Sequence, residues 1–199
     1  GVPDPQARSI EGAPSASPFR FRGSTLIDWM RVVDPMSRAL SASVKDRGAI
    51  LPLGRAKQQA YWYTSAGSFT TSNYYADTLP DWVKRFNALK LPERYAGREW
   101  KLLLDASEYP EPDTILFEAA GGSSVFPHRL PGDVAAATRT LASFPWIDQV
   151  NLEFALAGLD ALQLGKTGHT DLLSVSLSAT DAIGHAFGPD SRELHDQIL

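Results

Sequence analysis

The sequence contains no cysteine, and no run of about 18 apolar residues occurs anywhere along its 199 residues. The absence of cysteine excludes disulfides and thiolate metal sites and is compatible with either redox compartment. The absence of a long apolar run predicts no membrane-spanning helix. The net charge of −4 gives no basic field for a nucleic-acid platform, although single Arg and Lys side chains can still contact a phosphate. No signal peptide is recognisable.

What remains is the composition of a globular chain. Hydrophobic residues make up 43% and charged residues 21%, within the range of a single folded domain. Proline, serine and alanine are concentrated at the start of the chain, so residues 1–22 are predicted to form a flexible segment.

A carboxylate and an imidazole follow an apolar run near the end of the chain. Residues 172–177 are rich in leucine and valine, which predicts a strand, and Asp181 and His185 come shortly after it. On a helix these two side chains would share a face, and an oxygen plus an imidazole nitrogen suits zinc. The alternative is an Asp that caps a helix, followed by a solvated His. Chemistry in open α/β sheets lies beyond the carboxyl ends of strands, which favours the metal interpretation.

A second polar pair also follows a predicted strand. Residues 39–44 are expected to form a strand that ends just before Lys45 and Arg47. The alternative for this Lys-Asp-Arg sequence is an ordinary solvated charge cluster.

The two motifs together resemble the alkaline phosphatase superfamily. The segments that carry the resemblance run from Ser43 to Pro52 and from Thr180 to Ser191, and residues 69–75 and 79–83 are also similar. The most similar branch is the type I phosphodiesterase/nucleotide pyrophosphatase-like group, which contains the Lys-x-Arg bacterial alkaline phosphatases. The resemblance extends from about Arg22 to Leu199.

This resemblance implies a zinc-dependent phosphate monoester hydrolase with two zinc ions in the complete enzyme. Asp181 and His185 would be ligands of one zinc, while Lys45 and Arg47 would contact the phosphate oxygens. Two cations favour a dianionic monoester over a monoanionic diester. The substrate partner is therefore expected to be a small-molecule phosphate ester. Related enzymes are typically exported, which predicts a periplasmic or secreted location.

The family pattern is incomplete in this sequence. The family places a metal-binding Asp and a Thr or Ser nucleophile before the Lys-x-Arg element, and an Asp-His pair and a further His after the Asp-x-x-x-His element. Neither set has a counterpart, and His195 is expected in a helix rather than at the metal. The chain is therefore predicted to be an internal fragment of a larger enzyme, with weak or absent zinc because two ligands hold the ion poorly.

The expected fold class is α/β, with part of a parallel sheet flanked by helices and an inserted α+β cap. Residues 23–47 and 131–199 would form the partial core, and residues 48–130 the cap. A helix over 24–33 is expected to begin at a Ser24 cap and to bury Leu26, Trp29, Met30 and Val33. His128 is expected in a surface loop. Further elements are predicted at residues 61–63 with 69–72 (a hairpin), 79–89 (a helix), 100–104 (a strand), and 133–144 and 146–164 (two helices).

Two other functions stay open. One is a phosphodiesterase or nucleotide pyrophosphatase of the same superfamily, which would differ in the residues around the phosphate. The other is a noncatalytic module, because the strand over 172–177 expects neighbours on both sides and would otherwise expose apolar surface. Self-association through that surface is a possible partner interaction.

Overall fold

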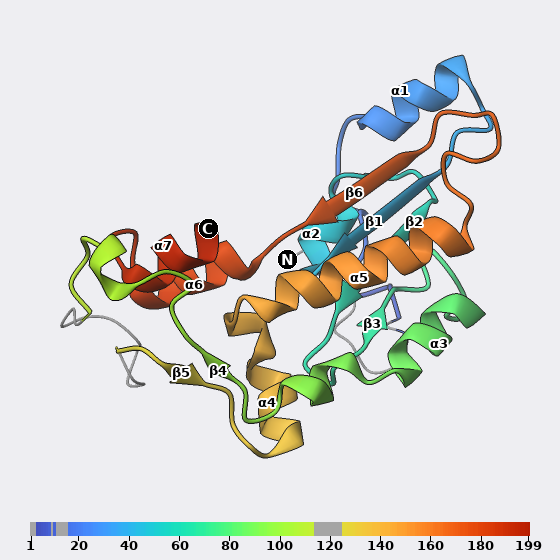
Figure 1. The fold of residues 1–199 in the computed structure, drawn as a ribbon. Helices are drawn as coiled ribbons and strands as arrows, with labels where there is room; N and C mark the ends of the chain where they lie inside the picture. The colour runs from blue at the N-terminus through green and yellow to red at the C-terminus, as the bar shows by residue number, and fades with distance from the viewer. Residues whose placement is uncertain (1–2, 9, 11–15, 114–124) are drawn as a thin grey trace. The chain divides into compact units, whose positions relative to one another are not determined.

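The computed structural model describes residues 3–8, 10, 16–113 and 125–199. The chain forms two compact units. Unit 1 consists of residues Gly1–Lys90 and Val150–Leu177, and unit 2 of residues Leu91–Gln149 and Ser178–Leu199. The fold is α/β and contains a parallel sheet flanked by helices, which confirms the predicted fold class (Figure 1).

Unit 1 contains the main sheet and most of its helices. Its elements in chain order are α1 (Leu26–Val33), β1 (Ala39–Ser43), α2 (Asp46–Ile50), β2 (Gln59–Tyr63), β3 (Phe69–Thr70), α3 (Asp81–Ala88), most of α5 (Trp146–Ala161) and β6 (Leu172–Ser176). Both predicted strands beside the polar pairs are therefore present, as are the hairpin and the helix before Leu89.

The strand order in the main sheet is β3-β2-β1-β6. β1 runs parallel to both β2 and β6, and β3 is antiparallel to β2. The last residue of β1, Ser43, lies opposite Trp62 on one side and Ser176 on the other. The chain therefore leaves β1 and β6 at the same edge of the sheet, the edge at which α/β proteins place their chemistry.

Alternating side chains of the central strands bury against helices on both faces of the sheet. On one face Ala39 and Ala60 pack with Ile27 of α1 and with Leu53, which follows α2. On the opposite face Leu40 and Tyr61 meet α3 and α5. Burial on both faces explains why the strands contain few polar side chains larger than serine.

Aromatic rings fill the α5 side of the sheet. Phe154, which is fully buried, stacks on Phe69 with a centroid separation of 3.8 Å. It also contacts Tyr61, Trp82 and Phe86. This cluster joins the sheet to α3 and α5.

The first helix is present, but the prediction of its buried face was wrong. Thr25 rather than Ser24 caps α1, in a capping box in which Asp28 accepts a hydrogen bond of 2.7 Å from the Thr25 N–H. Ile27 is fully buried, while three members of the predicted stripe are exposed: Leu26, Trp29 and Val33. The helix contacts the sheet through a narrow line of side chains, Ile27 and Met30, so its broader apolar stripe faces outward.

Two predicted segments can be compared with the units. Within residues 1–22, Ala16 is fully buried beside Ile50 and Trp62, while other described residues such as Phe19 and Arg20 are exposed, and the flexibility of the segment stays a prediction. Residues 48–130 contribute β2, β3 and α3 to unit 1 and several short elements to unit 2. The role of this segment as a cap stays a prediction.

Unit 2 is made of short elements. They are η1 (Leu91–Tyr95), β4 (Glu99–Trp100), η2 (Ala106–Glu108), β5 (His128–Arg129), α4 (Val134–Thr140), η4 (Leu141–Ser143), the first turn of α5, α6 (Ala179–Phe187) and α7 (Arg192–Ile198). The predicted strand at 100–104 is shorter than expected, because only Glu99 and Trp100 pair with β5. Among the described residues, no helix has both the length and the apolar character to cross a membrane.

Candidate functional site

Lys45 and Arg47 lie directly after β1, as predicted. Lys45 is the N-terminal flanking residue of α2, and its backbone N–H donates a hydrogen bond of 3.0 Å to Ser43 Oγ. The Lys45 side chain is half-buried and the Arg47 side chain is exposed. The two cations therefore flank the turn from β1 into α2.

A glycine lets α2 approach this edge of the sheet closely. A Cβ atom at Gly48 would lie 2.3 Å from Ser43 Oγ, closer than side chains can pack, and 3.0 Å from Ser176 Oγ, a tight contact. Only glycine fits here without a shift of α2 or of the two serines. The position of the Lys45–Arg47 turn therefore depends on small residues at the ends of β1 and β6.

Asp181 and His185 lie on α6, in unit 2. Ala179 and Ile183 of this helix are fully buried, while Asp181 and His185 point to solvent, with side chains 51% and 82% exposed. His185 Nε2 lies 3.4 Å from Asp181 Oδ1. The prediction that the two side chains share a face is confirmed, and the residue flanking the helix is Ser178, so Asp181 is not its cap.

Burial of polar groups in unit 2 was missed by the sequence reasoning. His128 is 6% exposed and lies in β5, so the prediction of a surface loop was wrong. Its Nε2 is 2.7 Å from Oε1 of Glu193, which is also buried. The ring is enclosed by aromatic side chains: Trp100, Phe126 and Phe187. Trp100 and Phe187 are distant from His128 in the sequence, so its burial does not follow from the local pattern.

A second buried carboxylate holds α7. Asp196 accepts hydrogen bonds from Trp100 Nε1 at 2.6 Å, from the Leu103 N–H at 2.7 Å and from Tyr109 Oη at 2.5 Å. Burial and the contact with Asp196 raise the pKa of Tyr109. His195 lies in α7 as expected and pairs with Glu111 at 3.1 Å, which lowers the pKa of that carboxyl.

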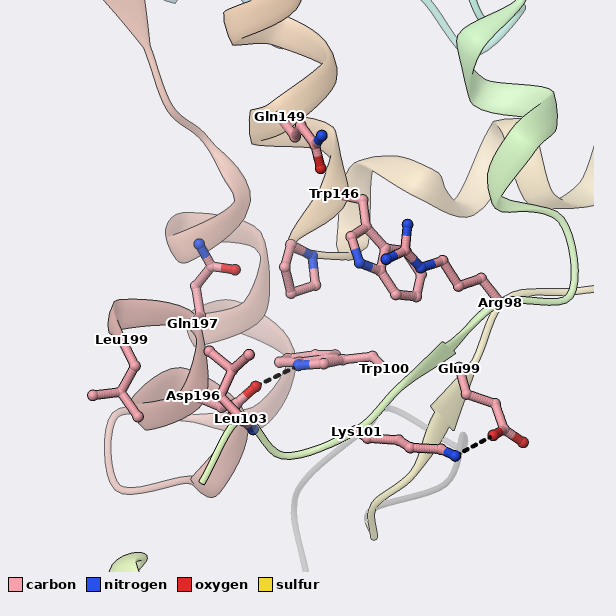
Figure 2. Close-up of a pocket in the computed structure, with 11 residues that line it drawn as sticks. Arg98, Glu99, Trp100, Lys101, Leu103, Trp146, Gln149, Asp196, Gln197 and Leu199 are labelled. Carbon is pink, nitrogen blue, oxygen red and sulfur yellow. Dashed lines mark hydrogen bonds and ion pairs between the residues drawn. The ribbon is translucent and has the colours of Figure 1, made fainter. Parts of the chain in front are cut away.

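A hollow of about 420 Å³ lies beside Asp196 (Figure 2). Trp100 and Trp146 border it, and Arg98 rests over the Trp146 ring at 4.8 Å from the ring centroid. Figure 2 also shows Lys101 directed toward Glu99, its ion-pair partner at 3.3 Å. None of the four predicted site residues borders this hollow.

Comparisons with known proteins agree with the two motifs. A family model described as type I phosphodiesterase / nucleotide pyrophosphatase matches residues 29–199. The chain belongs to this family. Alkaline phosphatase PhoV of Synechococcus elongatus is 42% identical over 191 residues, which cover 92% of this chain and 34% of PhoV.

The chain also matches solved structures of the alkaline phosphatase PafA. The alignment with the wild-type structure has a TM-score of 0.88 and 30% identity. It covers all of this chain and 40% of the PafA chain. A PafA variant with four substitutions aligns with the same TM-score at 29% identity, and the alignment covers 41% of the variant chain. The chain thus spans about a third of the length of PhoV and of PafA from Elizabethkingia meningoseptica.

The side chains of Asp181 and His185 on α6 fit part of a zinc site. A carboxylate oxygen and an imidazole nitrogen are both zinc ligands, and both are accessible. No group of three or more His, Asp or Glu side chains suited to a metal is found in the described part of the chain. Zinc is usually held by three or four protein ligands, so Asp181 and His185 would be one part of such a site.

Proposed function

We propose that the complete protein is a zinc-dependent phosphate monoester hydrolase. The observation that carries this proposal is the position of the two polar pairs in the chain. Lys45 and Arg47 come directly after β1, and Asp181 and His185 come in the helix that follows β6, the parallel neighbour of β1. Relatives that share this region are named alkaline phosphatases. The substrate would be a small-molecule phosphate ester.

Lys45 and Arg47 are proposed to contact the oxygens of the phosphoryl group. Arg presents a planar fork of donors and Lys a compact point charge, and both stabilise negative charge that develops during transfer. The PafA variant gives indirect support, since it replaces a Thr, an Asn, and a Lys and an Arg separated by one residue. That Lys and Arg have the spacing of Lys45 and Arg47.

Asp181 and His185 are proposed to hold one of two zinc ions. When bound, zinc supplies a Lewis acid that lowers the pKa of an oxygen nucleophile and neutralises charge on the phosphate. The pair on α6 would provide one carboxylate and one imidazole, while the remaining ligands and a Thr or Ser nucleophile would lie outside this chain. The chain alone is expected to bind zinc weakly.

The test of the phosphate assignment compares monoester and diester hydrolysis in the complete protein. Lys45→Ala and Arg47→Ala are each expected to lower kcat/KM for p-nitrophenyl phosphate by about tenfold or more. The loss for bis-p-nitrophenyl phosphate should be smaller, because a diester carries one negative charge less. Lys84→Ala, which removes an exposed lysine of α3, is the matched control. Equal losses for both substrates would contradict the assignment.

A phosphodiesterase or nucleotide pyrophosphatase is the second candidate, favoured by the name of the matching family. It would hydrolyse the diester faster than the monoester before any substitution.

A noncatalytic association role is the third candidate. It is favoured by the half-buried β6, whose outer edge has no strand partner among the described residues, and by exposed Leu177. The enzyme proposal includes a periplasmic or secreted location, on the resemblance alone.

A further inference from the structure

The start of α6 is capped by a side chain from another helix. Asp148 lies in the first turn of α5, and its Oδ1 accepts hydrogen bonds from the Ser178 N–H at 2.7 Å and the Ala179 N–H at 3.1 Å. Oδ2 lies 3.3 Å from the same Ala179 nitrogen. All of these groups belong to unit 2. The carboxylate thus joins the beginnings of α5 and α6.

This contact replaces the usual local cap. The first N–H groups of a helix have no partner within the helix, and a Ser at the flanking position normally accepts one of these hydrogen bonds. Ser178 makes no such bond with its own side chain. Ser178 and Ala179 are both buried, so water has little access to replace the carboxylate. A negative charge at this end also interacts favourably with the helix dipole.

The cap determines where the exposed face of α6 lies. Ala179 and Ile183 are fully buried and one helical turn apart, which fixes the rotation of the helix about its axis. Asp148 holds the Ala179 backbone and so fixes the position of the helix along that axis. Asp181 lies two residues after Ala179, and His185 follows one helical turn later on the same face of α6. The helix that carries both side chains therefore begins at the contact made by Asp148.

We propose that Asp148 is a positioning residue for the Asp181–His185 pair, which it holds in place for a divalent metal through the N-terminus of α6. The inference rests on the proposed function, because the metal role of the pair does. The contacts that Asp148 makes with the start of α6 are to the backbone N–H groups of Ser178 and Ala179, so it acts through the helix backbone.

The experiment measures zinc affinity of the complete gene product by competition with a fluorescent chelator, using zinc alone as the ligand. Asp148→Ala is expected to weaken zinc binding by about tenfold, the range seen when groups that orient metal ligands are removed. Asp148→Asn should lose less, because one carbonyl oxygen in the place of Oδ1 can still accept the two shorter hydrogen bonds.

Asp133→Ala is the matched control. Asp133 also caps a helix of unit 2, since its Oδ1 accepts a hydrogen bond of 2.8 Å from the Ala136 N–H at the start of α4. That helix carries none of the predicted ligands. The control should lower stability by loss of a cap and leave zinc affinity unchanged.

Hydrogen exchange in the metal-free protein provides a second readout. Asp148→Ala should speed exchange of the α6 amides, whereas Asp133→Ala should affect α4 instead. If both variants change zinc affinity equally, or if Asp148→Ala leaves it unchanged, the positioning role is wrong. If Asp181→Ala and His185→Ala do not weaken zinc binding, the metal assignment itself fails, while faster exchange in α6 would still report the cap.

Discussion

The contacts of α5 with the sheet in unit 1 and those of α7 in unit 2 are made by different kinds of side chain. Unit 1 is built around aromatic and aliphatic side chains of the parallel sheet, with Phe154 at the centre of a group of rings. Unit 2 buries two carboxylates of α7, Glu193 and Asp196, each with its own hydrogen-bond partners. Apolar packing tolerates some variation in shape, whereas a buried carboxylate needs each partner present. Asp181 and His185, the proposed metal pair, belong to unit 2.

The largest effect on stability is expected at the centre of unit 1. Phe154→Ala removes a fully buried ring and should lower the free energy of unfolding by about 3–5 kcal/mol, measured by urea denaturation. Leu156→Ala, on the exposed side of the same helix, should change it by no more than about 0.5 kcal/mol. Similar losses for the two variants would refute the ring cluster as the core of unit 1.

The matching substitution in unit 2 is Asp196→Ala. It leaves the Trp100 Nε1, the Leu103 N–H and the Tyr109 hydroxyl without their acceptor and should lower the free energy of unfolding by about 3 kcal/mol. Hydrogen exchange should locate the loss in unit 2, at the amides of α7 and of residues 99–109. Faster exchange in the sheet of unit 1 instead would show that the two units are not stabilised separately.

Two helical glycines sharpen the comparison at a smaller scale. A Cβ at Gly158 of α5 would lie 2.5 Å from Leu40 Cδ2 and 2.9 Å from Trp82 Cη2, so Gly158→Ala should cost about 1–3 kcal/mol. A Cβ at Gly184 of α6 meets nothing closer than 3.7 Å, and Gly184→Ala should be neutral or stabilising by about 0.5–1 kcal/mol. Thermal denaturation of both variants checks this, and a stabilised Gly158→Ala would contradict the close packing.

The smallest expected effect is a difference in pH dependence. Burial raises the pKa of the Asp171 carboxyl in unit 1, but hydrogen bonds from Arg38 and Gly165 outweigh it and lower the pKa overall. Its contribution to stability is present above the pKa of the unfolded chain, about 4, and is lost as the pH falls through the lower folded value.

Asp148 in unit 2 should show the opposite sign. Burial raises its pKa more than the hydrogen bonds from Ala179 and Ser178 lower it. Folding then favours the protonated form, so this titration reduces stability as the pH rises from the unfolded pKa through the folded one. Urea denaturation between about pH 3 and 7 measures how the free energy of unfolding changes with pH. Asp171→Asn should remove a contribution that rises with pH, and Asp148→Asn a contribution that falls with pH. Slopes of the same sign would contradict these pKa shifts.

The same contrast explains which parts of the fold could be predicted from the sequence. β1 and β6 were predicted correctly because each is a short uncharged run of small and apolar residues that ends at a polar turn, and the helices around them show clear periodicity. The buried face of α1 could not be predicted, because the pattern marks an apolar stripe but not which part of it meets the sheet. The burial of His128 and Asp196 depends on partners far away in the sequence.

The candidate site divides in the same way. The shared face of Asp181 and His185 follows from helical spacing alone, and the structure confirms it. Asp148 carries no motif, since its carboxylate caps a helix that begins 30 residues later in the chain. Ser178 at the flanking position would itself predict a local cap. The roles of Lys45, Arg47, Asp181 and His185 stay predictions.

The most direct test of the account is made on the complete gene product. Its intact mass, its zinc content and its turnover of p-nitrophenyl phosphate would be measured on one sample. The account predicts a chain longer than 199 residues that carries about two zinc ions and hydrolyses the monoester. A product that ends at Leu199, contains no metal and leaves the monoester intact would contradict it, and would direct the search for a function to what the chain binds.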